Sequence, residues 1–135
     1  NDGMARYITD RFTRSILDLG KDLKKSRLLI MGFTFKENCP DIRNTKVLDI
    51  YKNLSLQSNV DIYDTQADAK ETKELYGVEL INELKPGIYD GLILAVPHKE
   101  IIELGIDFIK GLGTDNLIFY DLKSIFGKEV SDLRS

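Results

Sequence analysis

The chain has 135 residues, enough for one domain but not comfortably for two. Its 19 Lys and Arg residues against 22 Asp and Glu residues give a net charge of -3, so it lacks the large basic surface on which nucleic-acid binding depends. Its one cysteine, Cys39, excludes an internal disulfide, and one cysteine with one histidine excludes a Cys/His metal cluster. No apolar run approaches the ~20 residues that span a bilayer. We therefore expect neither a nucleic acid nor a membrane as a partner.

The first 25 residues predict one long helix. Its apolar residues recur at steps of three and four and so share one stripe: Met4, Ile8, Phe12, Ile16, Leu19 and Leu23. Lys24 and Lys25 place positive charge at its C-terminal end, where the helix dipole is negative. In a domain this small we expect the first part of the stripe, from Met4 to Ile16, to be partly uncovered and to mediate self-association.

From Arg27 onwards, short apolar runs alternate with helical patterns. The expected strands are 28–31, 60–64, 78–81, 91–96 and 117–120, and the expected helices follow them at 47–54, 67–76 and 98–110. Such alternation implies right-handed crossovers and a mostly parallel sheet with helices on both faces. The expected fold is α/β, a Rossmann-like three-layer domain over residues 26–135, preceded by the long helix of residues 1–25.

In open α/β sheets, ligands bind outside the carboxyl ends of the strands, which directs attention to the loops that follow them. The loop 32–45 is the richest, but it contains neither G-x-G-x-x-G nor a Walker sequence. It can stack a ring on Phe33 or Phe35 and present Lys36 and Arg43 to phosphate or carboxylate. The alternative is that its aromatic rings fill the sheet edge while Asp41 pairs with Arg43 to fix the loop.

The motif Gly-x-x-Phe-Lys at 32–36, followed by Asp-x-Arg at 41–43, resembles the C-terminal, UDP-binding domain of the UDP-glucose/GDP-mannose 6-dehydrogenase family. The resemblance extends over nearly the whole chain, and the start at Asn1 to Met4 looks like the family's Asn-Asp-x-Met on the helix that joins its two halves. The segments 95–100 and 120–123 look most like the branch that acts on UDP-N-acetylhexosamines for surface polysaccharides, the Vi-antigen type.

This resemblance implies roles for individual residues. Phe35 and Lys36 would contact the UDP-sugar, and Lys123 stands where relatives carry a basic residue that also touches this substrate. Arg43 would reach the NAD cofactor, oriented by Asp41. The resemblance further implies a cytoplasmic, NAD-dependent enzyme that oxidises the sugar to a uronic acid and dimerises through the N-terminal helix.

The resemblance also indicates what this sequence does not contain. In the family, the catalytic cysteine, a catalytic Lys-Asp pair and the half that holds NAD belong to segments upstream of this domain. Cys39 lies in Asn-Cys-Pro-Asp, outside the catalytic motif, so we assign no catalytic residue and no metal ligand. The chain lacks an initiator methionine, and we expect a binding domain of a longer enzyme, inactive without its N-terminal half.

Two alternatives stay open, a free-standing α/β interaction or nucleotide-binding module and an independent NAD-binding protein, the second disfavoured by the absent glycine fingerprint. Two residues also have two interpretations each. Asp64 ends a strand where a dinucleotide domain places its ribose-binding acid, or it stabilises a turn or caps a helix. His98 contacts a ligand at a strand end, or it has a structural or capping role.

Overall fold

The computed structural model describes residues 3–134, so Asn1 and Asp2 of the Asn-Asp-x-Met motif lie outside the described part. Twelve elements follow one another along these residues: α1 (Gly3–Asp18), η1 (Leu23–Lys25), β1 (Arg27–Met31), α2 (Val47–Ser55), β2 (Asn59–Tyr63), α3 (Ala69–Tyr76), β3 (Leu80–Ile81), β4 (Tyr89–Leu94), α4 (Lys99–Glu103), α5 (Ile106–Lys110), β5 (Gly113–Asp121) and β6 (Leu133–Arg134).

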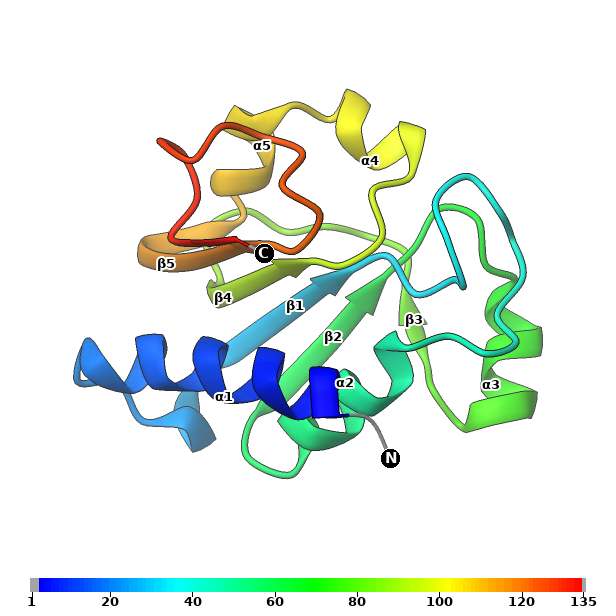
Figure 1. Ribbon diagram of the computed structural model, residues 1–135, viewed down its shortest axis with the longest axis horizontal. Helices are drawn as coiled ribbons and strands as arrows, with labels where there is room; N and C mark the ends of the chain where they lie inside the picture. Colours follow the sequence, from blue (N-terminus) through cyan, green and yellow to red (C-terminus); the bar gives the residue numbers. More distant parts are fainter. Residues whose placement is uncertain (1–2, 135) are drawn as a thin grey trace.

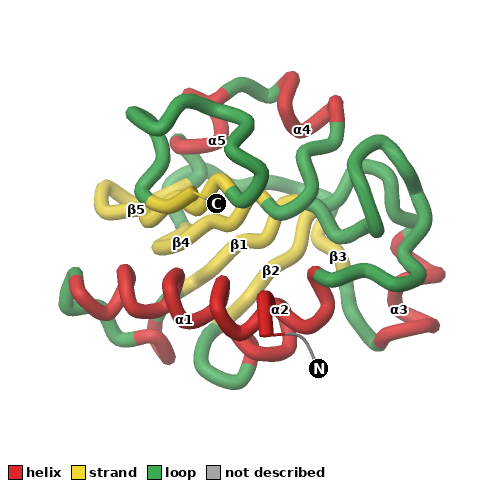
Figure 2. The backbone as a smooth tube through the Cα atoms, viewed as in Figure 1, coloured by secondary structure: helices red, strands yellow, loops and turns green. Residues whose placement is uncertain are grey.

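The strands form one six-stranded sheet in the order β3-β2-β1-β4-β5-β6, and each pairing between them is parallel. Figure 1 shows α1 and α2 on one face of this sheet, α4 and α5 on the other, and α3 beyond the β3 edge. Figure 2 shows the same three layers as helix, strand and helix. The predicted Rossmann-like α/β fold is confirmed.

Strand β1 lies at the centre of the sheet, between β2 and β4, which explains its unbroken apolar run. Its residues 28–31 are all fully buried, because each sheet face is covered by a separate apolar cluster. One cluster joins Leu28 and Ile30 to α1 and α2, and the other joins Leu29 and Met31 to α4 and α5.

The N-terminal helix is shorter than predicted. It ends at Asp18, and the chain then turns through Gly20, whose φ of +83° is a conformation that a glycine adopts without strain. Lys24 and Lys25 belong to the separate turn η1, which Asp22 caps by accepting a hydrogen bond from the Lys24 amide. The apolar spacing continues through Leu19 and Leu23, but the helix does not.

The expectation of an uncovered stripe is wrong for Ile8, Phe12 and Ile16, which are at most 4 % exposed. The reason is Gly91 of β4, which lets α1 lie directly on the sheet. A Cβ atom at Gly91 would be 2.5 Å from Phe12 Cζ and 2.9 Å from Ile16 Cδ1. Of the expected stripe, Met4 remains 61 % exposed.

The C-terminal half differs from the prediction in two further ways. The helix expected over 98–110 is split into α4 and α5 at Gly105, where φ is +86°. The short edge strand β6 was not predicted from the sequence. Along residues 3–134, none of the helices combines the length and apolar character needed to cross a membrane.

Candidate functional site

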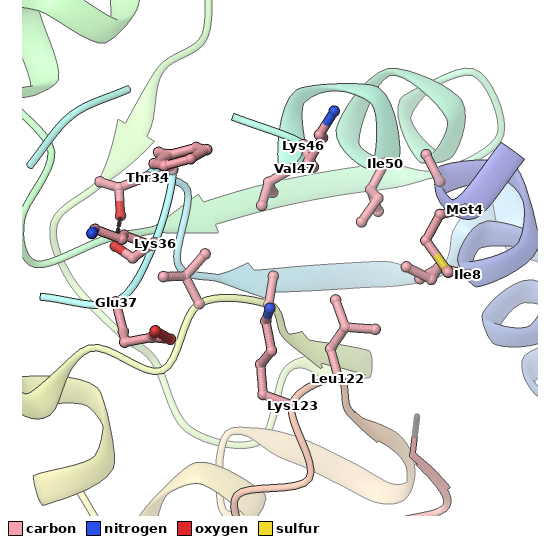
Figure 3. A pocket seen from close by; sticks show the side chains of 14 residues that line it. Met4, Ile8, Thr34, Lys36, Glu37, Lys46, Val47, Ile50, Leu122 and Lys123 are labelled. Atoms are coloured by element: carbon pink, nitrogen blue, oxygen red, sulfur yellow. Dashed lines mark hydrogen bonds between the residues drawn. The ribbon is translucent and has the colours of Figure 1, made fainter. Parts of the chain in front are cut away.

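A cleft of about 580 Å³ lies at the carboxyl edge of the sheet, where the fold class predicts a ligand site. It is enclosed by the N-terminal turns of α1, the start of α2 and the segments that follow β1, β4 and β5, as Figure 3 shows. Its lining is apolar along α1, α2 and the end of β4, and charged along the segments after β1 and β5: Met4, Ala5, Ile8, Thr34, Phe35, Lys36, Glu37, Lys46, Val47, Ile50, Ala95, Val96, Leu122 and Lys123.

The loop after β1 begins at Gly32, which only a glycine can occupy. Its φ is +96°, and a Cβ atom there would lie 2.4 Å from the carbonyl oxygen of Val96. The next residue, Phe33, is fully buried and packs edge-on against Tyr76, whose hydroxyl donates to the Ile42 carbonyl at 2.7 Å. Phe33 therefore fills the core, as one of the two interpretations of this loop predicted.

Phe35 and Lys36 leave the core at the next turn and line the cleft. The Phe35 ring is 51 % exposed, while its amide donates to the Asp41 carbonyl at 2.8 Å across the loop. The Thr34 hydroxyl donates to the Lys36 carbonyl at 2.9 Å, which tightens the turn between them. The two nearby aromatic residues thus differ: the Phe33 ring packs in the core, and the Phe35 ring is exposed at the cleft.

Three lysines line the cleft, Lys36, Lys46 and Lys123, together with one acidic residue, Glu37. None of the three lysine side chains forms an ion pair or hydrogen bond with another residue of the described chain. Figure 3 shows Lys123 extending from the segment after β5 towards the sheet, with Lys46 on the facing wall. Lys46 also precedes the first turn of α2, where the positive end of the helix dipole lies. The cleft therefore favours an anion.

Lys123 is held by a firmly built turn. Asp121, at the end of β5, is fully buried and accepts hydrogen bonds from the amides of Ile125 at 3.0 Å and Phe126 at 2.7 Å. Ser124 adopts a φ of +55° within this turn. The carboxylate of Asp121 therefore satisfies the backbone of the turn and leaves Lys123 exposed at the cleft.

The structure places Phe35, Lys36 and Lys123 around one cleft, but it does not bring Arg43 to it. Arg43 is 79 % exposed and forms a two-pronged ion pair with Asp41, with both N–O distances at 3.0 Å. The hydrogen bond from Arg43 lowers the pKa of Asp41, and the same contact raises the pKa of Arg43. Lys46 was not selected from the sequence, although its position just before an apolar helix pattern marks it as the start of a helix.

Asp64 proves to be a turn residue. Its buried carboxylate accepts hydrogen bonds from the amides of Phe33 at 2.6 Å, Gln66 at 2.6 Å and Ala67 at 2.7 Å. Burial alone would raise the pKa of this carboxyl, but the hydrogen bonds from His98 and from these amides lower it. Helix α3 is capped by Asp68 instead.

His98 is fully buried, lies outside the cleft lining and makes no capping hydrogen bond to α4. Its ring nitrogens contact Asn38, Thr34 and Asp64, and Cys39 is not among their partners. Among residues 3–134, no group of three or more His, Cys, Asp or Glu side chains is placed to hold a metal ion.

The chain is similar to known proteins over most of its length. A model of the UDP-glucose/GDP-mannose dehydrogenase family, UDP binding domain, matches residues 29–128. The chain is 42 % identical over 135 residues to a UDP-N-acetyl-D-glucosamine 6-dehydrogenase of Salmonella typhi and 40 % identical to one of Pseudomonas aeruginosa, covering 99 % of this chain and 32 % of each relative. It thus spans about a third of the length of the curated relatives it matches.

A solved structure supports the fold independently. The crystal structure of an NDP-N-acetyl-D-galactosaminuronic acid dehydrogenase from Methanosarcina mazei Go1 superposes with a TM-score of 0.81 at 20 % identity, over 96 % of this chain and 27 % of that one. At this identity the likeness concerns the fold alone.

Proposed function

Because the chain belongs to the UDP-glucose/GDP-mannose dehydrogenase family and matches its UDP binding domain, we propose that it is the UDP-sugar-binding part of an NAD-dependent nucleotide-sugar 6-dehydrogenase. Two relatives at 40 % identity or more are named for UDP-N-acetyl-D-glucosamine, so a UDP-N-acetylhexosamine is the proposed substrate. The full-length enzyme would oxidise it to the uronic acid for surface polysaccharide synthesis in the cytoplasm.

The observation that carries the proposal is the cleft lined by three lysines and only one acidic residue. Lysine binds phosphate as a point charge, and a helix N-terminus adds partial positive charge, so the diphosphate of UDP would lie between Lys36, Lys46 and Lys123 near the start of α2. The apolar wall of α1 and α2 and the exposed Phe35 ring offer a surface for the uracil ring.

The NAD of the full-length enzyme would be held mainly by a part outside this chain, and it would supply the hydride acceptor. Arg43 suits a contact with it, because its guanidinium is exposed and Asp41 occupies Nε and Nη2 only. The glycine fingerprint for NAD and the motif of the catalytic cysteine are expected in that other part. In this proposal the chain therefore binds the UDP-sugar and does not catalyse its oxidation.

We propose that residues 1–25 connect this domain to that other part and that the enzyme forms a homodimer through α1. The buried residues of α1 already pack on the sheet and Met4 lines the cleft, so the dimer contact would use the outer face, where Tyr7 and Leu17 are more than half exposed. Light scattering tests this: a protein that stays monomeric at high concentration contradicts the dimer.

Calorimetric titration of this chain with UDP and with NAD tests the binding proposal. We expect UDP to bind, and each of Lys36→Ala and Lys123→Ala to weaken it about tenfold, because each removes a charge-assisted contact of about 1.5 kcal/mol. Lys85→Ala, an exposed lysine away from the cleft, is the matched control and should leave the affinity unchanged. Binding of NAD alone would indicate an independent NAD-binding protein, and no binding of either ligand would favour an interaction module.

A further inference from the structure

The ring of His98 connects the ends of three strands. His98 follows β4, and its Nδ1 lies 2.9 Å from the amide nitrogen of Asn38 in the loop after β1. Its Nε2 lies 2.9 Å from Oδ2 of Asp64, just after β2, and 3.1 Å from the hydroxyl of Thr34. The side chains of His98 and Asp64 are both fully buried, so these contacts are shielded from water.

These contacts define the tautomer of the ring. A backbone amide can only donate, so Nδ1 accepts from Asn38 and carries no proton. The proton is therefore on Nε2, which donates to the carboxylate of Asp64. Both ring nitrogens are thus satisfied while the ring is neutral.

The two loop residues that His98 contacts lie on either side of residues 35–37. Thr34 precedes this tripeptide; its hydroxyl donates its one proton to the Lys36 carbonyl, so towards the protonated Nε2 of His98 its oxygen accepts. Asn38 follows it with a φ of +60°, and its side-chain oxygen accepts the Lys99 amide at 2.7 Å. The side chains of residues 35–37 are exposed and make no hydrogen bond of their own within the described chain. Their placement at the cleft therefore depends on the two flanking anchors.

We propose that His98 is a positioning residue for UDP-sugar binding. It does not line the cleft, and it acts by holding Thr34 and Asn38 so that Phe35 and Lys36 are presented to the ligand before the ligand arrives. Preorganisation of this kind raises affinity, because the competent conformation need not be selected from a mobile ensemble. This inference rests on the proposed function for its ligand, and on the hydrogen bonds alone for its anchoring role.

Two substitutions by amide side chains separate the acceptor role of Nδ1 from the donor role of Nε2. His98→Asn can place its oxygen near the position of Nδ1 and keep an acceptor for the Asn38 amide. His98→Gln can place its nitrogen near the position of Nε2 and keep the donor to Asp64, but it leaves the Asn38 amide without an acceptor. We expect His98→Gln to weaken UDP binding about tenfold and His98→Asn to weaken it about threefold or less.

A control variant separates positioning from general destabilisation. Thr72 is buried in α3, where its hydroxyl donates to the Asp68 carbonyl, and it is absent from the cleft and from the His98 contacts. Thr72→Ala should lower the unfolding midpoint and leave the UDP affinity within about twofold of the wild type. Equal affinities for His98→Gln and the wild type would overturn the proposal.

Two measurements decide the anchoring role without UDP. His98 is the single histidine of the sequence, so its ring nitrogens can be assigned directly by nuclear magnetic resonance, and Nδ1 must be the unprotonated one. The Asn38 amide should exchange with solvent at least about tenfold faster in His98→Gln than in His98→Asn, while amides of β1 keep their protection. A proton on Nδ1, or unchanged exchange at Asn38, refutes the anchoring role. If the wild type does not bind UDP, the proposed function fails, and these two measurements still decide whether His98 holds the loop.

Discussion

Replacing Gly32 with alanine tests the junction on which the loop after β1 depends. Gly32 has a φ of +96°, and its amide donates to the Tyr63 carbonyl at 2.8 Å, so it continues the pairing of β1 with β2. A Cβ atom there would lie 2.4 Å from the oxygen, 2.5 Å from Cβ and 2.6 Å from the nitrogen of Val96. Two of these three atoms belong to the backbone, which cannot rotate away as the end of a side chain would.

The magnitude has two parts. A non-glycine residue at positive φ costs about 1–2 kcal/mol, and overpacking against atoms that cannot move away adds about 1–3 kcal/mol. Gly32→Ala should therefore lower the free energy of unfolding by about 4 kcal/mol. For a domain of this size that corresponds to a fall of about 16 °C in the unfolding midpoint.

Gly20→Ala is the matched control, because Gly20 has a φ of +83° but no atom within 4 Å of the added Cβ. It should cost only the conformational part, about 1–2 kcal/mol. Urea unfolding of both variants and the wild type measures the difference. If Gly32→Ala loses no more stability than Gly20→Ala, the close approach of β1 to Val96 does not constrain this junction.

Three further predictions concern single contacts. Asp64→Asn should cost about 3 kcal/mol in urea unfolding at pH 7, because an amide cannot accept all four buried donors. The lowered pKa of Asp64 means that this contribution is present above about pH 4 and is lost as the pH falls further, so the variant should lose less stability than the wild type in acid. Burial and the hydrogen bond to Asp61 raise the pKa of Tyr89, so alkaline difference spectra should show one of the six tyrosines ionising last. The contribution of Tyr89 to stability should be present below about pH 10 and lost as the pH rises further. Arg43→Ala should leave UDP affinity within about twofold, and a larger loss would place Arg43 at the cleft.

The fold class could be predicted because its strands are marked by local pattern. Residues 28–31 and 91–94 form unbroken apolar runs, and a strand covered on both faces needs such a run. The errors lie where the outcome depends on distant parts of the chain. Apolar spacing continues past Asp18 although the helix ends there, and β6 has two residues that become a strand only by pairing with β5.

The position of the cleft could be predicted from the strand pattern, whereas the choice of residues within it rested on the family resemblance. Phe35, Lys36 and Lys123 follow strands, and parallel strands bring such residues to one edge. The contact of His98 with Asp64 could not be predicted, because it depends on the exact register between β1, β2 and β4. Likewise, nothing local distinguishes Phe33 from Phe35, and their separation follows from the turn at Gly32.

The parallel arrangement of the strands has a consequence for how the chain folds. No two neighbouring strands of the described sheet form a hairpin, and the central pair joins Leu28 to Gly91, which lie far apart along the chain. Strand pairing therefore requires the closure of long loops, and the chain loses this entropy before strand contacts stabilise the pair. Folding is therefore slow relative to helical or hairpin-rich domains of similar length. Strand β2 can cover one edge of the apolar strand 28–31 early, but the other edge stays open until β4 arrives beside β1. During synthesis β1 emerges long before β4, and an apolar strand with an unpaired edge is prone to aggregation in that interval.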